Sequence, residues 1–489
     1  MGVIVAVAAG NNGPDPATVG SPATAPSVIA VGASANDRVL AASASVDGGG
    51  SYAAIPASSA RGAAVKAALA DVAAVDGTGL ACGALPVNSL QDRIALILRG
   101  TCTFEEKLNS AQRAGAVAAL VYTDQARPDP IGMAVGAATL PAEMISYQSG
   151  IDIKQRLGAP LTATLTFTLG PVYTSPDKLA DFSSKGPNLD SAIKPDLVAV
   201  GMNVYTAAQK SDSRGPLYDA NGFTIVDGTS FSSPMVAGAA AVLKAARPGL
   251  TAAQYRSLLI NSAARICCTT QQVGAGSLDL SAALRSTAAL LPVSLSFGAG
   301  GPDGIVTRNL TISNVGASTE TFLLSAVARN GGPVPAFSRD SVQLDAGASA
   351  GVTVTFAAAG LTAGAYEGFV SVQGTASGIE MRVPYWYGVP SGVPRYITVL
   401  DEQSSGRAGA LVSDAVLFRI TDAAGLLAEG LTPEVSVVSG GGTVVSVRSR
   451  QGISPGAFGL NVRLGPRSGA NVFRIQAGDM TRDVTIVAR

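Results

Sequence analysis

The sequence predicts an α/β region followed by two all-β sandwich regions, and three patterns lead to this fold class. Near the start, residues 2–9 and 27–33 are continuous runs rich in Val, Ile and Ala, which are typical of parallel strands covered on both faces. Between residues 93 and 122, a strand, a helix and a strand follow one another. After Leu290, short runs of alternating apolar and polar residues are separated by turn residues, as in β-sandwiches.

Length and composition set the first limits on function. A chain of 489 residues is long enough for about three domains, each with its own core. Hydrophobic residues make up 47% of the chain and charged residues 14%, which indicates globular domains. Lys+Arg and Asp+Glu balance at 34 each without a basic block, so we expect no nucleic-acid partner. No apolar run approaches the roughly 18 to 20 residues of a membrane span, so none is expected.

The first region opens with an apolar run. Residues 1–9 lack the basic segment of a signal peptide, so we interpret them as a buried parallel strand. Residues 27–33 form a second such run, and the turn at residues 10–14 separates the two.

The next region, up to about residue 176, has its own pattern. Residues 93–100 predict a strand, residues 104–114 have helical spacing, and residues 116–122 predict the next strand. A small α/β element is therefore expected here. Three charged residues on the helix are interpreted as a solvated face: Glu105, Glu106 and Lys107.

Later elements follow the same rules. Residues 235–246 and 252–262 predict helices, the second with Thr251 as its N-cap. The alternating β pattern is clearest at five apolar positions, Leu310, Ile312, Val352, Val354 and Phe356. Four further short strands are predicted at residues 416–422, 434–438, 459–464 and 472–477. Trp386, the only tryptophan, is expected to pack between domains.

Four cysteines are too few for a disulfide scaffold. Cys82 and Cys102 are far enough apart to form a bridge, with buried thiols as the alternative. Cys267 and Cys268 are adjacent and would bond each other only under strain, so we expect two buried thiols there. With no Cys-x-x-Cys and no histidine, we expect no metal site of the zinc type.

The stretch at residues 228–238 reads Gly-Thr-Ser-Phe-Ser-Ser-Pro-Met-Val-Ala-Gly and carries a candidate nucleophile. It lies where the polar stretch 219–229 gives way to the predicted helix. Ser230 would therefore sit at a helix start, where free N–H groups and the helix dipole favour a developing negative charge. A serine hydroxyl needs a base to take its proton, and the usual base, histidine, does not occur in the sequence. The predicted site is therefore incomplete.

Residues 228–238 resemble the nucleophile motif of the subtilisin-like serine proteases, or subtilases, Gly-Thr-Ser-x-(Ser/Ala)-x-Pro-x-Val-Ala-Gly. The sequence Ala-Ala-Gly-Asn-Asn-Gly at residues 8–13 resembles the segment that carries the oxyanion asparagine in that family. Residues 21–23 and 27–33 resemble the strand that follows it, and residues 182–187 and 193–201 resemble the stretch leading to the serine. The blocks occur in the family's order, which makes a chance match a poor explanation.

The resemblance implies roles for particular residues. Ser230 would attack the peptide carbonyl, and Asn11 would stabilise the oxyanion together with the N–H of Ser230. Taken alone, Asn11 would be interpreted as a turn residue, and the other blocks of the resemblance favour the oxyanion role. Five further residues would contact the polypeptide substrate, the first three as one wall of the specificity pocket: Ala8, Ala9, Gly10, Gly228 and Thr229. No cofactor is expected, and structural calcium, although possible, is not visible in the sequence.

The resemblance also predicts what is missing. Subtilases carry Asp, His, Asn and Ser in that order, and this chain starts just before the asparagine block. We therefore expect the blocks that bear the acid and the base upstream of Met1. The expected fold of the first region is a partial doubly wound parallel sheet with apolar strand faces that lack partners.

Four domains are predicted on this basis. Residues 1–38 and 177–289 would form the C-terminal part of a subtilase domain. Residues 39–176 resemble a protease-associated (PA) domain, in which the counterparts of Cys82 and Cys102 are often disulfide-linked. Residues 290–389 resemble a fibronectin type III-like sandwich, and residues 395–489 a bacterial immunoglobulin-like sandwich. The linkage would suit a secreted or cell-surface protein.

Two functions are compatible with these features. The first is a serine endopeptidase that forms an acyl-enzyme on Ser230, with the Asp and His of the triad outside this chain. The second is a non-catalytic secreted adhesion or binding protein on a degenerate subtilase scaffold. In both cases the PA-like and sandwich domains would make protein or cell-surface contacts.

Overall fold

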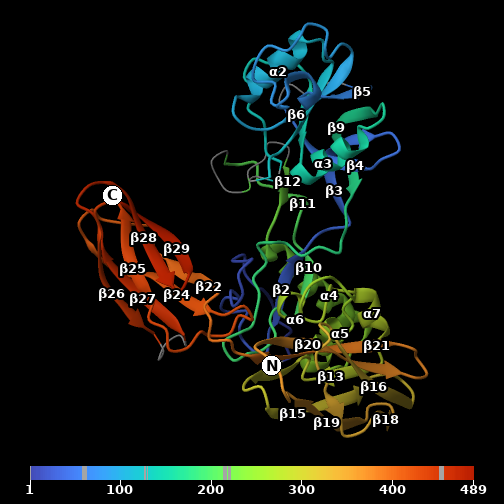
Figure 1. The fold of residues 1–489 in the computed structure, drawn as a ribbon. Helices are drawn as coiled ribbons and strands as arrows, with labels where there is room; N and C mark the ends of the chain where they lie inside the picture. Colours follow the sequence, from blue (N-terminus) through green and yellow to red (C-terminus); the bar gives the residue numbers. More distant parts are fainter. Residues whose placement is uncertain are drawn as a thin grey trace. The chain divides into compact units, whose positions relative to one another are not determined.

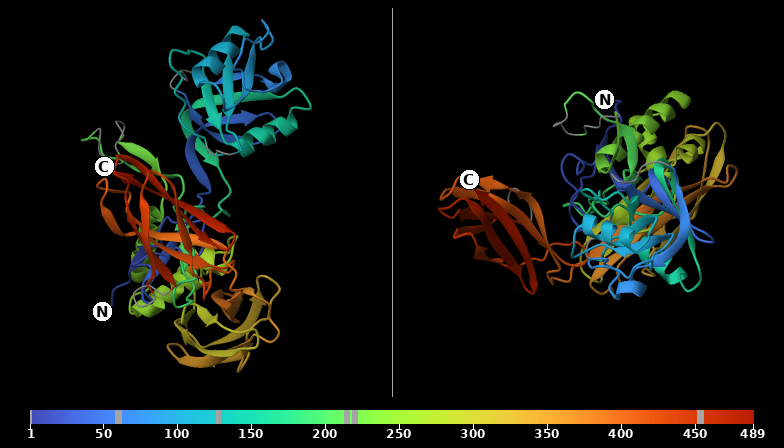
Figure 2. Two further views of the ribbon diagram at one scale, coloured as in Figure 1. Left: turned by 60° about the vertical axis from the view of Figure 1, so that its left-hand side comes forward. Right: turned by 90° about the horizontal axis from the view of Figure 1, so that it is seen from above.

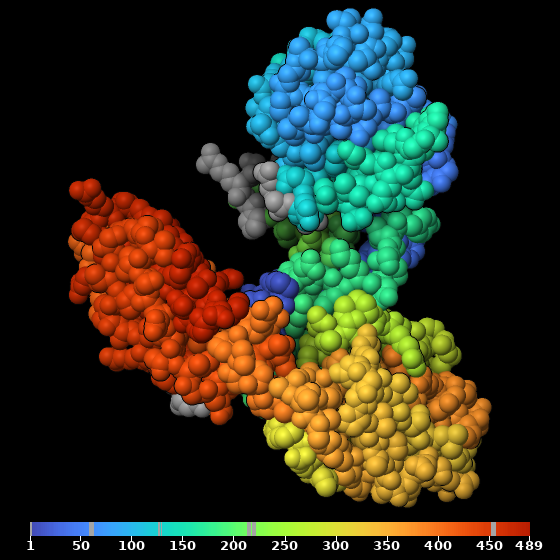
Figure 3. Space-filling model, in the orientation of Figure 1, coloured from blue at the N-terminus to red at the C-terminus, as the bar shows by residue number. Residues whose placement is uncertain are grey.

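The computed structural model describes residues 2–57, 63–125, 128, 130–212, 217, 222–450 and 456–489 (Figures 1, 2 and 3). The chain forms two compact units. The first comprises Met1–Ala35, Asp177–Met202 and Val226–Arg489, and the second comprises Asn36–Pro176 and Asn203–Ile225. Met1, at the start of the first predicted strand, and residues 219–221 of the polar stretch before Ser230 lie outside the described residues.

A three-stranded parallel sheet is the centre of the α/β part of the first unit. Its order is β1 (Ala6–Ala8), β2 (Ile29–Ser34) and β10 (Leu197–Val200). All six residues of β2 are buried, because this strand has a hydrogen-bonded neighbour on each side and α4 (Thr229–Ala246) shares its hydrophobic core. The predicted buried strand at residues 27–33 is confirmed.

The first predicted strand differs from the structure. Only Ala6–Ala8 are in strand conformation, and the side chains of Val3 and Val5 are 67% and 45% exposed. Among the strands that the structure describes, β1 lies at the edge of the sheet and pairs with β2 alone. The prediction of a continuous buried strand over residues 2–9 was therefore wrong, because burial on both faces needs further neighbours that the described residues do not supply.

The helices agree better with the prediction. The helix α4 begins at Thr229 rather than Met235 and contains Pro234. As predicted, Thr251 caps α5 (Ala252–Asn261), and its hydroxyl accepts the N–H of Gln254 in a capping box. Two shorter helices follow, α6 (Thr270–Val273) and α7 (Leu280–Arg285).

Residues after 287 form two pairs of sheets. The first pair has the strand orders β13-β15-β19-β17 and β14-β21-β20-β16-β18. Leu310 lies opposite Val352 within one sheet, and the rings of Phe297 and Phe356 stack between the sheets with centroids 5.3 Å apart. The alternating positions thus face a shared core. The strands are β13 (Ala288–Leu291), β14 (Leu295–Ala299), β15 (Ile305–Asn314), β16 (Glu320–Ala328), β17 (Ala336–Phe337), β18 (Ser341–Leu344), β19 (Ser349–Ala357), β20 (Gly364–Gly374) and β21 (Glu380–Val389).

The second pair of sheets has the orders β22-β24-β27-β26 and β23-β29-β28-β25. The four strands predicted from short apolar runs correspond to β24, β25, β27 and β28. Trp386 of β21 is fully buried. It lies beside Ile193, in the segment before β10, and beside Leu426, in the segment after β24. The strands are β22 (Tyr396–Glu402), β23 (Ser405–Gly406), β24 (Leu411–Thr421), β25 (Glu434–Ser439), β26 (Thr443–Ser449), β27 (Ala457–Arg463), β28 (Gly469–Ala477) and β29 (Met480–Ala488).

The second unit contains a closed barrel with the strand order β3-β4-β8-β7-β6-β5-β9, in which β5, β6, β7 and β8 run parallel. One face of β6 packs against α2 and the other against α3, so the predicted strand–helix–strand element is confirmed. The elements are β3 (Arg38–Val46), β4 (Ser51–Pro56), β5 (Val65–Asp71), α1 (Ala73–Asp76), β6 (Arg93–Leu98), α2 (Phe104–Arg113), β7 (Ala118–Tyr122), β8 (Ala142–Ile145), α3 (Tyr147–Arg156), β9 (Thr162–Tyr173) and the pair β11 (Val204–Ala207) and β12 (Phe223–Val226). Among the helices that the structure describes, none is both long and apolar enough to cross a membrane.

Three expectations about polar and sulfur groups are settled by this fold. Cys82 and Cys102 are bonded to each other, with their Cα atoms 5.7 Å apart. Cys267 and Cys268 are also bonded, so the expectation of two buried thiols was wrong; a positive φ of 77° at Cys268 turns the backbone between them. The solvated-face interpretation was wrong for Lys107, which is fully buried because its ammonium donates to two backbone carbonyl groups.

A buried carboxyl group lies in β8. Glu143 alternates with Ala142 and Met144 and has 0% exposure. Among the described residues, none hydrogen-bonds to either of its carboxyl oxygens. Burial therefore disfavours the charged form and raises the pKa of Glu143 to about 8.

This raised pKa makes the stability of the second unit depend on pH. The folded state keeps the proton up to about pH 8, whereas the unfolded carboxyl loses it at its ordinary value of 4.5, so stability falls as the pH rises between these values. Between pH 4.5 and 7 the loss amounts to about 3 kcal/mol. Glu143→Gln is expected to remove this dependence.

The free energy of unfolding of the second unit is measured by titrating the full chain with urea at several pH values. Hydrogen exchange of the β6–β8 segment reports the unfolding of this unit. Asp47→Asn, which changes an exposed acid of the same unit, is the matched control. If the free energy of unfolding changed with pH in the same way in the wild type and in Glu143→Gln, the prediction would be contradicted.

Candidate active site

Ser230 is the second residue of α4 and its side chain is exposed. Gly228, the N-cap residue, has a φ of +149°, a conformation that residues with a Cβ rarely adopt. The N–H of Ser230 belongs to the first turn, where a helix offers no carbonyl acceptor of its own. Ser230 thus combines an accessible hydroxyl with an N–H group at the positive end of the helix dipole.

Asn11 is held against the same helix start. Its Oδ1 accepts the backbone N–H of Thr229 at 3.0 Å and the hydroxyl of Thr229 at 2.8 Å. Because both hydrogen bonds are accepted by Oδ1, they fix which end of the amide is the oxygen and which is the nitrogen, Nδ2. Its Nδ2 lies beside Gly228, 3.6 Å from where a Cβ on that glycine would be. Among the described residues, none accepts a hydrogen bond from Nδ2, so this donor remains for a ligand next to Ser230.

The loop that presents Asn11 is fixed from a third segment. The Oγ of Ser184 accepts the N–H of Asn12 at 3.1 Å, and the N–H of Ser184 donates to the carbonyl of Gly10 at 3.0 Å. A Cβ on Gly10 would lie 2.8 Å from that Oγ, and the φ of Gly10 is +111°, so only glycine suits this position. The block at residues 182–187 therefore supports the Asn11 loop.

A buried carboxylate ties the elements beneath the site together. Oδ2 of Asp196 accepts the backbone N–H of Ala30 at 2.8 Å and lies 2.7 Å from Nζ of Lys194. Oδ1 of Asp196 lies 2.7 Å from the guanidinium of Arg256 on α5. These interactions of Asp196, which we call the clasp, join the segment before β10 to β2 and to α5.

The structure brings the predicted site residues together around the start of α4. Ala8 and Gly10 are half-buried in the segment that leads to Asn11, and the N–H of Gly10 donates to the hydroxyl of Thr229 at 3.3 Å. Ala9 is fully buried, and its carbonyl accepts the N–H of Gly20 at 3.3 Å. Thr229 has a role that the sequence did not reveal, since it anchors both Gly10 and Asn11.

Exposed apolar residues occur on α4 and just before β1. Met235 and Val242 on α4 are seven residues apart, and so lie on one helix face, and are 38% and 50% exposed. The helix α4 contacts β1, and Val3 and Val5 just before β1 are also exposed. Apolar side chains on a central helix and a sheet edge are typical of a surface that another segment covers.

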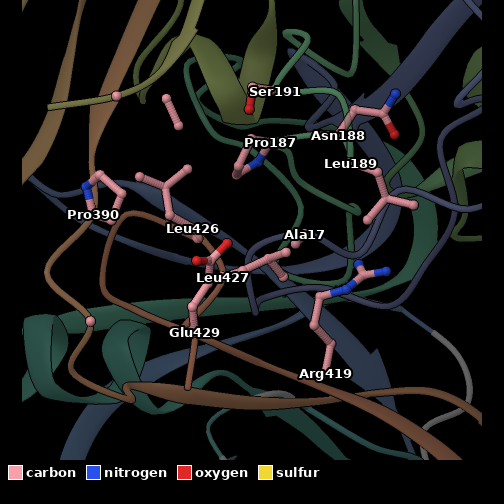
Figure 4. Close-up of a pocket in the computed structure, with 14 residues that line it drawn as sticks. Ala17, Pro187, Asn188, Leu189, Ser191, Pro390, Arg419, Leu426, Leu427 and Glu429 are labelled. Carbon is pink, nitrogen blue, oxygen red and sulfur yellow. The ribbon is translucent and has the colours of Figure 1, made fainter. Parts of the chain in front are cut away.

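A cavity of about 340 Å³ occurs elsewhere in the first unit (Figure 4). Its wall includes Pro187, Ser191, Pro390, Arg419 and Leu426, and neither Asn11 nor Ser230. This cavity is therefore separate from the serine site.

An exposed serine at a helix start, with an oriented amide donor beside it, is typical of serine-type acyl-transfer sites. The family model described as "Subtilase family" matches residues 1–300. The chain therefore belongs to the subtilase family.

Relatives agree with this assignment. The chain is similar to "Minor extracellular protease Vpr" of Bacillus subtilis (strain 168), with 30% identity over 312 residues, which cover 61% of this chain and 37% of that protein. It is similar to "Subtilisin-like protease SBT5.4" of Arabidopsis thaliana, with 32% identity over 284 residues, which cover 53% of this chain and 35% of that protein. The chain thus spans little more than a third of the length of these relatives.

Among solved structures, the chain is similar to the psychrophilic subtilisin-like protease Apa1 from Pseudoalteromonas sp. AS-11. The identity is 18%, the match covers 58% of this chain and 64% of that one, and the TM-score is 0.28. That TM-score is below the level at which two whole chains share a fold.

Proposed function

We propose that this chain is part of a subtilisin-like serine endopeptidase, in which Ser230 forms an acyl-enzyme with a polypeptide substrate. The observation that carries this proposal is the double hydrogen bond from Thr229 to Oδ1 of Asn11, which leaves Nδ2 beside Gly228, two residues before Ser230. A binding protein has no need of an oriented amide beside an exposed serine. Membership of the subtilase family supports the same function.

The reaction follows from this geometry. The Oγ of Ser230 attacks the carbonyl carbon of the scissile peptide bond, and the carbonyl oxygen becomes an oxyanion. Nδ2 of Asn11 and the N–H of Ser230 donate hydrogen bonds to that oxygen, and the start of α4 adds its dipole. The oxyanion then collapses, the peptide C–N bond breaks, and the amine leaves with the proton that the base took from Ser230. Water hydrolyses the resulting acyl-enzyme through a second oxyanion. The substrate would lie along the half-buried Ala8 and Gly10, whereas Ala9, Gly228 and Thr229 are buried and therefore support that segment rather than contact the substrate.

The proton of Ser230 needs an acceptor, and the sequence contains no histidine. We propose that the histidine base and its aspartate partner lie on polypeptide outside residues 1–489. That polypeptide would cover the exposed apolar side chains on α4, Met235 and Val242, and those just before the edge strand β1, Val3 and Val5. The relatives, which are much longer than this chain, have room for such a segment.

The finer domain assignments belong to this proposal. The barrel unit is proposed to be a PA domain that restricts or guides substrates. The two pairs of sheets after it are proposed to be fibronectin type III-like and immunoglobulin-like domains that contact proteins or a cell surface. A secreted or cell-surface location is supported by the bond between Cys82 and Cys102 and by the printed name of the Bacillus relative, an extracellular protease.

A labelling experiment tests the function. The chain is produced alone and fused to the polypeptide encoded directly upstream of the Met1 codon, where Asp-Gly and His-Gly-Thr blocks are expected. Each protein is treated with a fluorophosphonate, and the modified residue is mapped. We expect labelling at Ser230 in the longer protein, none in residues 1–489 alone, and none after Ser230→Ala.

Ser233→Ala, which changes a half-buried serine one turn further along α4, is the matched control and should still be labelled. Labelling of the chain alone would contradict the proposal of an external base. An unlabelled longer protein that contains both blocks would favour the non-catalytic adhesion alternative.

A further inference from the structure

The disulfide of the barrel unit has a buried lysine beside it. Cys82 is exposed and bonded to Cys102, which is half-buried. Nζ of Lys107 on α2 lies 3.8 Å from Sγ of Cys82. The same Nζ donates to the carbonyl of Leu80 at 2.6 Å and to the carbonyl of Leu98 at 3.1 Å. The two carbonyl groups therefore hold the ammonium at the sulfur.

The charge of Lys107 persists at neutral pH. Burial lowers its pKa to about 8, while the nearby carboxylates of Asp76 and Glu106 act in the opposite direction. Asp76 is itself held by the N–H groups of Gly79 and Ala81 at 2.6 and 2.9 Å. A lysine ammonium next to a cysteine stabilises the thiolate over the thiol.

We propose that the Cys82–Cys102 bond is a thiol-exchange site, in which Lys107 stabilises Cys82 as the departing thiolate. An external thiolate attacks Sγ of Cys102, and a new S–S bond forms to that sulfur. The bond between Cys102 and Cys82 breaks, and its electron pair moves to Sγ of Cys82, next to Nζ of Lys107. Exchange is faster when the departing sulfur is the weaker base.

The surroundings of Cys102 favour this direction. Thr103, the next residue, caps α2, and the carboxylate of Glu106 accepts the N–H and the hydroxyl of Thr103, each at 2.9 Å. The carboxylate thus occupies the backbone N–H at the helix start next to Cys102, whereas the ammonium lies beside Cys82. The departing thiolate is therefore Cys82, and the captured sulfur is Cys102.

With a dithiol as co-reactant the exchange runs to completion and balances. The second thiol of the dithiol attacks the mixed disulfide and releases Cys102. The dithiol loses two electrons and two protons and becomes a cyclic disulfide. The protein gains two electrons, one proton is taken up by Cys102, and the other goes to solvent while Cys82 stays a thiolate. A monothiol stops at the mixed disulfide on Cys102.

Two measurements on the full chain test the proposal. In the first, dithiothreitol reduces the protein at pH 7, and differential alkylation with peptide mapping follows Cys82 and Cys102 separately from Cys267 and Cys268. We expect Lys107→Met to slow reduction about tenfold. This value assumes that the pKa of the departing Cys82 thiol rises by about two units and that the Brønsted coefficient is near 0.5. Lys66→Met, which removes an exposed lysine of the same unit, should leave the rate unchanged.

The second measurement uses the wild type alone and stands even if Lys107→Met does not fold. Glutathione is added at pH 7, and the mixed disulfide is trapped by acid and mapped. We expect glutathione on Cys102, and a free Cys82 that is alkylated with an apparent pKa below the ordinary value of about 8.5. Glutathione found mainly on Cys82, or an unchanged reduction rate in a folded Lys107→Met variant, would overturn the proposal.

Discussion

Replacing Ser230 by alanine is expected to lower the turnover of a peptide substrate by about 10⁶-fold in a protein that contains the complete triad. The hydroxyl of Ser230 is the atom that bonds to the substrate, so its loss removes the acyl-enzyme route altogether. Only the residual catalysis of the oxyanion donors and of substrate binding would remain. Initial rates with a fluorogenic peptide measure this effect.

A second variant, Asn11→Ala, tests the contribution of the oxyanion donor while the nucleophile is unchanged. Asn11→Ala removes the Nδ2 donor and leaves Ser230 in place, so kcat should fall by about 10² to 10³. The Michaelis constant should change little, because the oxyanion forms only on the way to the acyl-enzyme. Ser233→Ala should retain wild-type turnover. A value of kcat within tenfold of the wild type for Asn11→Ala would show that Asn11 is a turn residue only.

Replacing Asp196 by alanine is expected to destabilise the first unit by about 3 to 5 kcal/mol. The substitution leaves two cations without their carboxylate: the side chains of Lys194 and Arg256 are only 3% and 18% exposed. It also leaves the N–H of Ala30 without the Oδ2 acceptor. Asp196→Asn keeps the shape of the side chain and should cost less.

Urea unfolding followed by tryptophan fluorescence measures this loss, because Trp386 is the only tryptophan and is fully buried in the same unit. Asp181→Ala, at an exposed acid of this unit, is the matched control and should stay within about 0.5 kcal/mol of the wild type. Equal midpoints for Asp196→Ala and Asp181→Ala would show that the clasp adds no stability.

Much of the fold could be predicted from local patterns. The buried strand β2, the helix α5 with its Thr251 cap, and the parallel pair β6 and β7 each followed from apolar runs, capping residues and helical spacing. These signals are local, because they depend on neighbours a few positions apart in the sequence. The pairing of Ser230 with Asn11 came instead from the family resemblance, since the two residues are 219 positions apart.

The failures depended on contacts between distant segments. Lys107 was interpreted as solvated because lysine usually is, but the carbonyl groups of Leu80 and Leu98 provide a buried site for its ammonium. The exposure of Val3 and Val5 depends on which strands flank β1. The role of Thr229 as the anchor of Asn11 needed the hydrogen-bond geometry. No periodicity in the sequence encodes these relations.

The points where the chain enters and leaves the barrel segment, residues 36–176, have an evolutionary consequence. Within the barrel unit, the N–H of Thr174 donates to the carbonyl of Asp37 at 2.9 Å, and within the first unit the N–H of Ala35 donates to the carbonyl of Lys178 at 2.8 Å. The place where the chain leaves and the place where it returns are thus adjacent on each side. A gene segment for residues 37–175 could be gained, lost or exchanged with only a short peptide left to span the junction. Such a module can diversify without disturbing the serine and its amide.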